Sequence, residues 1–574
     1  MVATPVKTKR LTVQVADLTA DTTAIRSLDW DRDRFDIEFG LQNGTTYNSY
    51  LIRGEKIALV DTSHEKFRQL YFDSLNGLIN PQEIDYLIIS HTEPDHSGLV
   101  KDLLQLAPNI TVVGSKVAIQ FLENLVHHPF QRQLVKNGDQ LDLGNGHILE
   151  FVNAPNLHWP DTIFTYDHGS GILFTCDAFG MHYCSDDLYD EQLSAIEPDY
   201  RFYYECLMAP NARSVLAAMK RMEPLGNINL VANGHGPVLK HNVTELLTRY
   251  RDWSQAQTKA EKTVAVFYIS DYGYSDRLCQ SIAKGITKTG LAVETLDLKS
   301  ADPQEVKELA SSAVGIVIGT PPVSGIHAQE ITGNLGTILA SVNPKQYLGM
   351  FESKGDDDES ILPLFNKFRE VGLTKAFDPI RSAETPNESL YQRCEEAGTD
   401  MGQLLTQEVK VKQRKSLDTD LDKAIGRISG GLYIITTKKG DRSGAMVASW
   451  VTQASFDPPG FTVAVAKDRA IESLMQVGDQ FILNILEEGN YQTLMKHFLK
   501  RFGPGEDRFA GVNTRTANNG SPILADALAY LECEVVSRME CADHWIVYNK
   551  VTDGRVSKPD SLTAVHHRKV GNYY

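Results

Sequence analysis

The sequence contains no run of 18 or more apolar residues, so no stretch of it is long enough to form a transmembrane helix. Its seven cysteines include no CxxC pair, which argues against a disulfide scaffold and favours a reducing, cytoplasmic location. The 57 basic residues are outnumbered by 74 acidic ones, and the net charge of −17 argues against nucleic acid as a partner. No GxGxxG motif follows an expected strand, so a separate Rossmann module for a nicotinamide is not expected.

What is present is an ordinary globular composition, with 42% apolar and 23% charged residues among 574. This length suits three or four domains. Two polar, charged segments divide the chain, at about residues 251–262 and 408–418. We therefore predict three domains, at residues 1–255, 263–407 and 420–574.

Side chains of the metal-ligand type follow several expected strands of the N-terminal segment. They are four imidazoles and three carboxylates: His91, Glu93, Asp95, His96, His158, Asp177 and His235. Such a set at strand ends meets the requirement of two metal ions that share one site. Without a thiolate it favours iron or manganese, although zinc is chemically compatible. Six other histidines follow no ligand pattern and are expected to be surface or core residues: His64, His127, His128, His168, His182 and His241.

The pattern HxExDH…H…D…H, preceded by GTTYNSYLIRGEKIALVDT at 44–62, resembles the metallo-β-lactamase-like domain of flavodiiron proteins. This resemblance implies an αββα sandwich with two iron ions and no catalytic residue beyond their ligands. It implies that one iron binds His91, Glu93 and His158, that the other binds Asp95, His96 and His235, and that Asp177 bridges them. Hydrolases of the same superfamily normally have histidine where this chain has Glu93.

Short apolar runs at 263–269, 313–319 and 348–353 alternate with amphipathic stretches, which predicts a doubly wound parallel sheet. After the first run, Ser270, Gly273 and Ser275 have the S/T-x-x-G-x-S/T spacing of a phosphate loop at a helix N-terminus. The segment resembles flavodoxin, which implies that FMN is bound. The expected contacts are Ser270, Tyr272, Gly273, Tyr274, Ser275, Thr320, Pro321 and Gly325. Whether the acidic run at 356–359 touches the flavin is left open.

β-Branched runs broken by GG, KGD and DPPG turns predict short antiparallel strands, and hence a barrel, in the C-terminal segment. This segment resembles the split-barrel NAD(P)H:flavin oxidoreductases. The resemblance implies a second flavin, FMN or FAD, and NAD(P)H as electron donor. It places along the flavin the residues Met446, Val447, Ala448, Ser449, Trp450, Val451, Thr452, Ala466 and Lys467.

Taken together, the three segments resemble the three-module flavodiiron proteins of oxygenic phototrophs. The resemblance implies an NAD(P)H:oxygen oxidoreductase that passes electrons through flavins to a diiron site and reduces O₂ to water. It also implies a head-to-tail homodimer, or a heterodimer with a paralogue. Three alternatives stay open: nitric oxide reduction at the same site, a binuclear zinc hydrolase, and an inactive partner subunit.

Overall fold

The computed structural model describes residues 10–35, 39–270, 275–299, 301–319, 328–352, 361–381, 386–416 and 419–568. The chain forms two compact units. The N-terminal unit consists of Met1–Phe35 and Leu41–Glu261, and the C-terminal unit consists of Asp36–Gly40 and Lys262–Tyr574. No helix within the described ranges combines the length and the apolarity that crossing a bilayer requires.

Two β-sheets form the centre of the N-terminal unit. The first has the strand order β1-β2-β5-β6-β7-β8-β9, and the second has the order β10-β11-β12-β13-β14. The strands of the first sheet span Leu11–Asp17, Thr22–Asp29, Thr45–Arg53, Ile57–Val60, Tyr86–Ile89, Thr111–Gly114 and Gln131–Leu134. Those of the second span Gln140–Gly144, His147–Asn153, Ile163–Asp167, Ile172–Cys176 and Leu230–Asn233.

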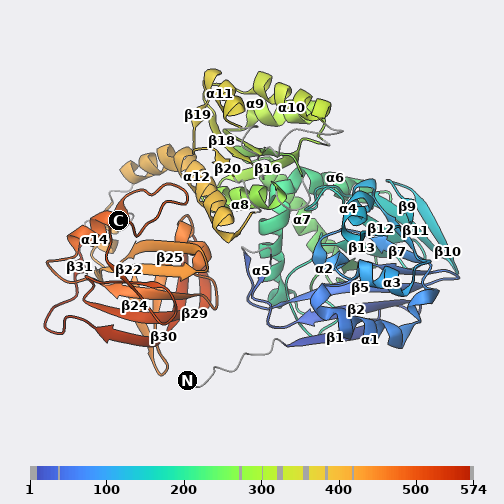
Figure 1. Ribbon diagram of the computed structural model, residues 1–574, viewed down its shortest axis with the longest axis horizontal. Coiled ribbons are helices and arrows are strands. Elements are labelled where there is room, and N and C mark those ends of the chain that lie inside the picture. Colours follow the sequence, from blue (N-terminus) through green and yellow to red (C-terminus); the bar gives the residue numbers. More distant parts are fainter. Residues whose placement is uncertain are drawn as a thin grey trace. The chain divides into compact units, whose positions relative to one another are not determined.

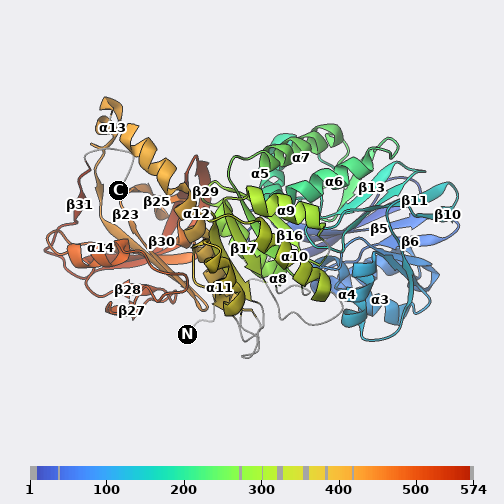
Figure 2. The same ribbon diagram turned by 90° about the horizontal axis from the view of Figure 1, so that it is seen from above.

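Helices cover the outer faces of both sheets, which gives four layers (Figure 2). The helices on the first sheet are α1 (Arg68–Leu78), α3 (Val100–Leu106) and α4 (Lys116–Val126). Those on the second are α5 (Leu193–Tyr203), α6 (Ala212–Met222) and α7 (Val243–Thr258). Ile88, Phe151 and Phe174 belong to the apolar cluster between the sheets. This confirms the expected αββα sandwich.

The first part of the C-terminal unit is a parallel sheet with the order β16-β15-β17-β18-β19, in which β20 also pairs with β18. Its strands β15 to β20 span Thr263–Tyr268, Ala292–Asp297, Gly315–Gly319, Tyr347–Glu352, Thr374–Lys375 and Ile380–Arg381. Its helices α8 to α12 span Ser275–Thr287, Pro303–Ser312, Ala328–Ser341, Leu362–Glu370 and Glu388–Ser416. Helices α9, α10 and α11 pack on one face, and α8 and α12 pack on the other (Figure 1). The expected doubly wound sheet is confirmed.

The second part of the C-terminal unit is an antiparallel sheet with the order β23-β22-β26-β29-β30-β25-β24. Strands β22 to β26 span Tyr433–Lys439, Arg442–Ala448, Val451–Phe456, Pro459–Ala466 and Gln480–Ile485, and β29 and β30 span Ala529–Cys541 and His544–Val556. Ile435, Val463, Phe481 and Val547, from four of these strands, meet in one buried cluster. The sheet therefore curls around its own core, as expected of the barrel.

Candidate metal centre

A short loop and helix after β7 hold four of the seven predicted donors. His91 follows this strand of the first sheet, and Glu93 immediately precedes α2 (Pro94–Ser97). Asp95 and His96 lie within α2. Glu93 lies before the first residue of α2 and Asp95 lies within it, so their carboxylates lie in two different groups of metal-ligand atoms, which are described below.

The other three donors come from the second sheet. His158 lies between β11 and β12, Asp177 directly follows β13, and His235 follows β14. Strands β13 and β14 are parallel neighbours, so both chains leave the sheet at the same edge. The Gly234 amide donates to the Cys176 carbonyl over 2.6 Å, which extends the strand pairing up to the two donors. Loops from both sheets thus meet at one end of the sandwich.

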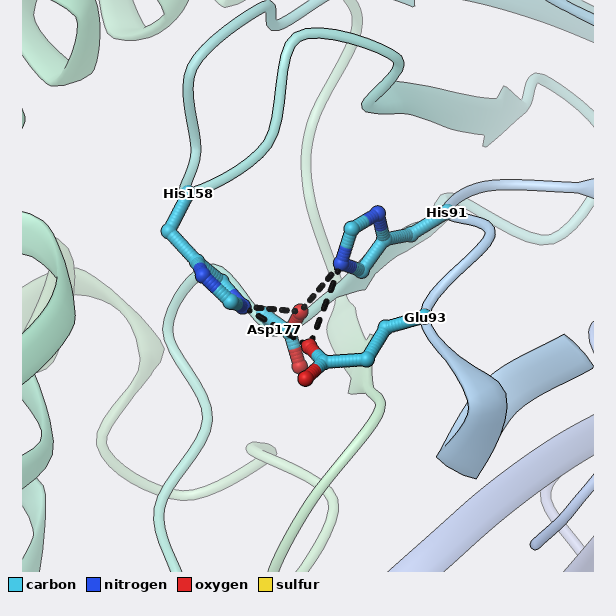
Figure 3. A group of neighbouring side chains, drawn as sticks. All are labelled: His91, Glu93, His158 and Asp177. Carbon is cyan, nitrogen blue, oxygen red and sulfur yellow. Dashed lines mark ion pairs between the residues drawn. The ribbon is translucent and has the colours of Figure 1, made fainter. Parts of the chain in front are cut away.

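The donor atoms form two groups. Within each group they lie within 4.8 Å of one another; the first consists of His91, Glu93, His158 and Asp177 (Figure 3), and the second of Asp95, His96 and His235. Asp177 reaches both. Its Oδ2 lies 3.5 Å from His91 Nε2 and 3.4 Å from His158 Nε2. Its Oδ1 lies 3.0 Å from His96 Nε2 and 3.1 Å from His235 Nε2. A carboxylate in this position is suited to be shared between two metal ions.

The distances between donor atoms fit bound metal ions. Two ligands at about 2.1 Å from one ion lie about 3.0 Å apart at a right angle and about 3.4 Å apart at the tetrahedral angle. Glu93 Oε2 lies 3.0 Å from His158 Nε2 and 3.4 Å from His91 Nε2. In the described part of the chain, His91 Nε2 and Asp177 Oδ2 are buried and make no hydrogen bond. Both atoms are therefore left to bind a metal ion.

The centre is enclosed except on the side of two carboxylates. The side chains of His91 and His96 are fully buried, whereas those of Glu93 and Asp95 are 12% and 20% exposed. A small molecule would therefore reach the centre past Glu93 and Asp95.

The carboxylates of the site keep His96 and His158 protonated when no metal is bound. Burial alone would lower the pKa of His96, but Asp95 and Asp177 raise it to about 9. Against the same effect of burial, Glu93 and Asp177 raise the pKa of His158 to about 10. At pH 7 both rings carry a proton that a metal ion must displace.

We therefore expect Fe(II) to bind more tightly as the pH rises. Below the raised pKa values, affinity should increase about tenfold per pH unit for each ion whose ligand loses one proton. The pH dependence should level off above about pH 10. The measurement is an anaerobic Fe(II) titration of metal-free protein in weak buffer, with a pH indicator that reports the protons released. Binding near pH 7 that releases no proton would contradict the expectation.

Two residues near the centre were not predicted from the sequence. His182, expected to be an ordinary surface or core residue, packs its ring 4.5 Å from that of His235, and its Nδ1 lies 2.7 Å from Thr45 Oγ1. Burial, and then the neighbouring His235, lower its pKa well below the usual value, so the ring is neutral. Asp161 contacts His91. The only sequence signal for Asp161 was its place three positions after His158.

The structure describes only part of the predicted FMN site. Ser270 lies after β15, and Ser275 begins α8. The Ser270 hydroxyl donates to Asp297 Oδ2 over 2.7 Å, and its backbone N–H lies 3.2 Å from Asp297 Oδ1. The hydroxyl must turn away from Asp297 before it can donate to a phosphate. Outside the described residues lie Tyr272, Gly273, Tyr274, Thr320, Pro321, Gly325 and the acidic run 356–359.

The predicted flavin contacts of the barrel lie on β23, between β23 and β24, on β24 and at the end of β25. Val447 and Ala448 pack into apolar clusters on opposite sides of β23, so they would meet a flavin through their backbone. The Trp450 ring lies 5.1 Å from that of His544, and the Arg568 guanidinium lies 5.0 Å from the Trp450 ring. The aromatic surface of Trp450 is thus already in contact with two side chains.

Three further predicted flavin contacts are polar. Ser449 is buried, and its hydroxyl makes no hydrogen bond within the described residues, which leaves it for a ligand. Thr452 is exposed on β24. Lys467 forms an ion pair with Glu540 and lies 5.1 Å from the Trp545 ring. Of these side chains, Ser449 best fits a contact within a binding site.

Comparisons with known proteins match both units. A family model described as "ODP family beta lactamase" matches residues 45–236, and one described as "Flavin reductase like domain" matches residues 425–573. Diflavin flavoprotein A 1 of Synechocystis sp. is 70% identical over 99% of this chain and 98% of that protein. Putative diflavin flavoprotein A 3 of Nostoc sp. is 69% identical over the full length of both. The solved flavodiiron core of Flv1 from Synechocystis sp., a metal-soaked structure, is 38% identical, covers 69% of this chain and 99% of its own, and has a TM-score of 0.63.

The fold and the paired donor groups therefore define an oxidoreductase of the flavodiiron class, whose cofactors are iron and flavin. Within this class, the chain belongs to the diflavin flavoprotein A family.

Proposed function

We propose that the protein is an NAD(P)H:oxygen oxidoreductase that reduces O₂ to water. The observation that carries the proposal is the position of Asp177, whose two oxygens face separate donor groups. We assign one iron to His91, Glu93 and His158 and the other to Asp95, His96 and His235, with Asp177 as the bridge. The flavin-reductase-like match in the same chain supports a built-in supply of electrons.

The proposed reaction consumes two NAD(P)H, one O₂ and two protons, and it yields two NAD(P)⁺ and two water molecules. When bound, flavins convert hydride to single electrons, and an iron pair delivers electrons to a small substrate. Asp177 holds the two metal positions together, and the buried imidazoles keep water from surrounding them. Glu93 provides a hard oxygen donor in place of an imidazole, which favours iron over zinc.

We further propose the flavin contacts predicted above and three domains, at residues 1–255, 263–407 and 420–574. The two family-model matches fall within the first and the third of these ranges. A head-to-tail homodimer, or a heterodimer with a paralogue, is part of the proposal. So is a cytoplasmic location, which is supported by seven free cysteines.

The test is the metal and flavin content of the isolated protein, followed by O₂ uptake with NADPH and with NADH. We expect two iron ions and two flavins per chain, and two NAD(P)H oxidised per O₂ consumed. Added catalase should release no O₂, because the product is water. Two zinc ions and no iron would contradict the proposal. If nitric oxide is reduced to nitrous oxide faster than O₂ is consumed, the substrate is nitric oxide and the proposal of O₂ is wrong.

A further inference from the structure

A buried carboxylate lies behind one of the proposed iron ligands. Asp161 Oδ1 is 2.9 Å from His91 Nδ1. The Thr92 amide and hydroxyl both donate to Asp161 Oδ2, over 2.7 Å and 2.5 Å. The Ser115 hydroxyl donates to the Asp161 backbone carbonyl over 2.8 Å. Asp161 is completely buried, so both carboxylate oxygens have fixed protein partners.

These contacts determine which nitrogen of His91 carries the hydrogen. A carboxylate oxygen only accepts, so Nδ1 must be the N–H that donates to Asp161. In the neutral ring, which is the form that binds a metal ion, the lone pair of His91 is then on Nε2, which lies 3.4 Å from Glu93 Oε2 and 3.5 Å from Asp177 Oδ2. The ring is thereby held in the tautomer and orientation that a metal ion at the first donor group requires.

The imidazoles of the second donor group have different partners. His235 Nδ1 lies 2.6 Å from the backbone carbonyl of Thr46, which carries no net charge. His96 Nδ1 has no hydrogen-bond partner among the residues that the structure describes. A carboxylate acceptor makes a ligand imidazole more basic than a neutral acceptor does. The two metal positions therefore differ in the hydrogen-bond partners of their ligand imidazoles.

We propose that Asp161 is a positioning residue, which holds His91 as an Nε2 ligand and strengthens metal binding at the first position only. The inference rests on the ligand assignment of the proposed function. It predicts that Asp161→Asn weakens binding of one of two Fe(II) ions by 10- to 100-fold and leaves the other unchanged. Asparagine has a single acceptor oxygen, so it cannot serve both His91 and Thr92.

The same unit contains a matched control. Asp167 Oδ2 lies 2.8 Å from His147 Nδ1 and also accepts from the Ser170 hydroxyl over 2.6 Å. Asp167 and His147 are buried and belong to neither donor group. Asp167→Asn therefore perturbs the same kind of carboxylate–imidazole contact without touching a proposed ligand.

The experiment is an anaerobic Fe(II) titration of each metal-free full-length chain, with Mössbauer spectra of the ⁵⁷Fe-loaded proteins. We expect two ions in the wild type and in Asp167→Asn, and one tight ion with partial loss of one iron signal in Asp161→Asn. If Asp161→Asn binds two ions at wild-type affinity, or if Asp167→Asn loses as much Fe(II) affinity as Asp161→Asn, the inference is wrong, but the ligand assignment still stands. Fewer than two ions in the wild type would overturn the ligand assignment as well.

A milder variant keeps the test decisive if Asp161→Asn does not fold. Thr92→Val removes the hydroxyl donor to Asp161 Oδ2 and leaves the amide donor in place. We expect it to weaken the same single ion several-fold, and wild-type binding of both ions in this variant would count against the inference.

Discussion

Replacing Asp177 with alanine is expected to lower NAD(P)H-dependent O₂ uptake by about a thousandfold or more, because both metal positions lose the ligand that we propose they share. Burial would raise the pKa of Asp177, but His96, His158 and His235 hold it well below the usual value, so the carboxylate is ionised. Its removal therefore takes away a negative charge that faces four buried imidazoles. Reduction of an external dye by NAD(P)H should persist, since the barrel carries the flavin-reductase-like match.

The two activities are measured on the same preparation, with an oxygen electrode for O₂ uptake and absorbance for the dye. Asp167→Asn serves as the control for a buried aspartate that holds an imidazole outside the donor groups. It should retain both activities. Loss of dye reduction in Asp177→Ala would show that the change disturbs the whole chain, and it would contradict the division of labour between the segments.

The donors could be predicted because each of them follows a strand. Strand ends are visible as apolar runs, and parallel strands bring their carboxyl ends to one edge of a sheet. Asp161 and His182 lacked such a signal, because their roles come from packing. Asp161 contacts a histidine 70 positions away, and His182 contacts Thr45 across 137 positions. No local pattern encodes either contact.

The fold was predicted better within segments than between them. The apolar runs at 263–269, 313–319 and 348–353 correspond to β15, β17 and β18. The polar segments expected to divide the chain are instead largely helical. Helix α7 continues to Thr258, and helix α12 continues to Ser416. Charged and amide side chains are good helix formers, and neither segment contains the glycine or proline that ends helices. A polar composition therefore does not distinguish a helix from a linker.

The flavin contacts show a different limit. Resemblance named consecutive residues of one strand, but Val447 and Ala448 necessarily face opposite sides of the sheet. Both side chains pack into apolar clusters, so the sequence could name the strand without naming the atoms that would meet a flavin. Ser449 differs, because it is buried with a hydroxyl that makes no hydrogen bond in the described structure.

Ending the chain after Ser416 is expected to abolish NAD(P)H oxidation while leaving a yellow, iron-containing protein. The cut lies at the end of α12, whose Tyr391, Cys394 and Met401 pack in the core of the parallel sheet. Buried Lys288 loses its partner Glu472 but keeps its ion pair with Glu395. Glu396 loses its partner Arg508 but keeps the hydrogen bond from Gln392, and the cut exposes it to water. The solved flavodiiron core, which covers 69% of this chain, supports the choice of segment.

The shortened protein should reduce O₂ only when an external reductant, such as chemically reduced free flavin, replaces the barrel. With NAD(P)H alone, O₂ uptake should stay at the background rate. The full-length Asp177→Ala variant retains a barrel, so adding it tests whether another chain can supply the electrons. A colourless product that still binds two iron ions would contradict the FMN assignment to residues 263–407. O₂ uptake with NAD(P)H alone would contradict the assignment of hydride acceptance to the barrel, which carries the flavin-reductase-like match.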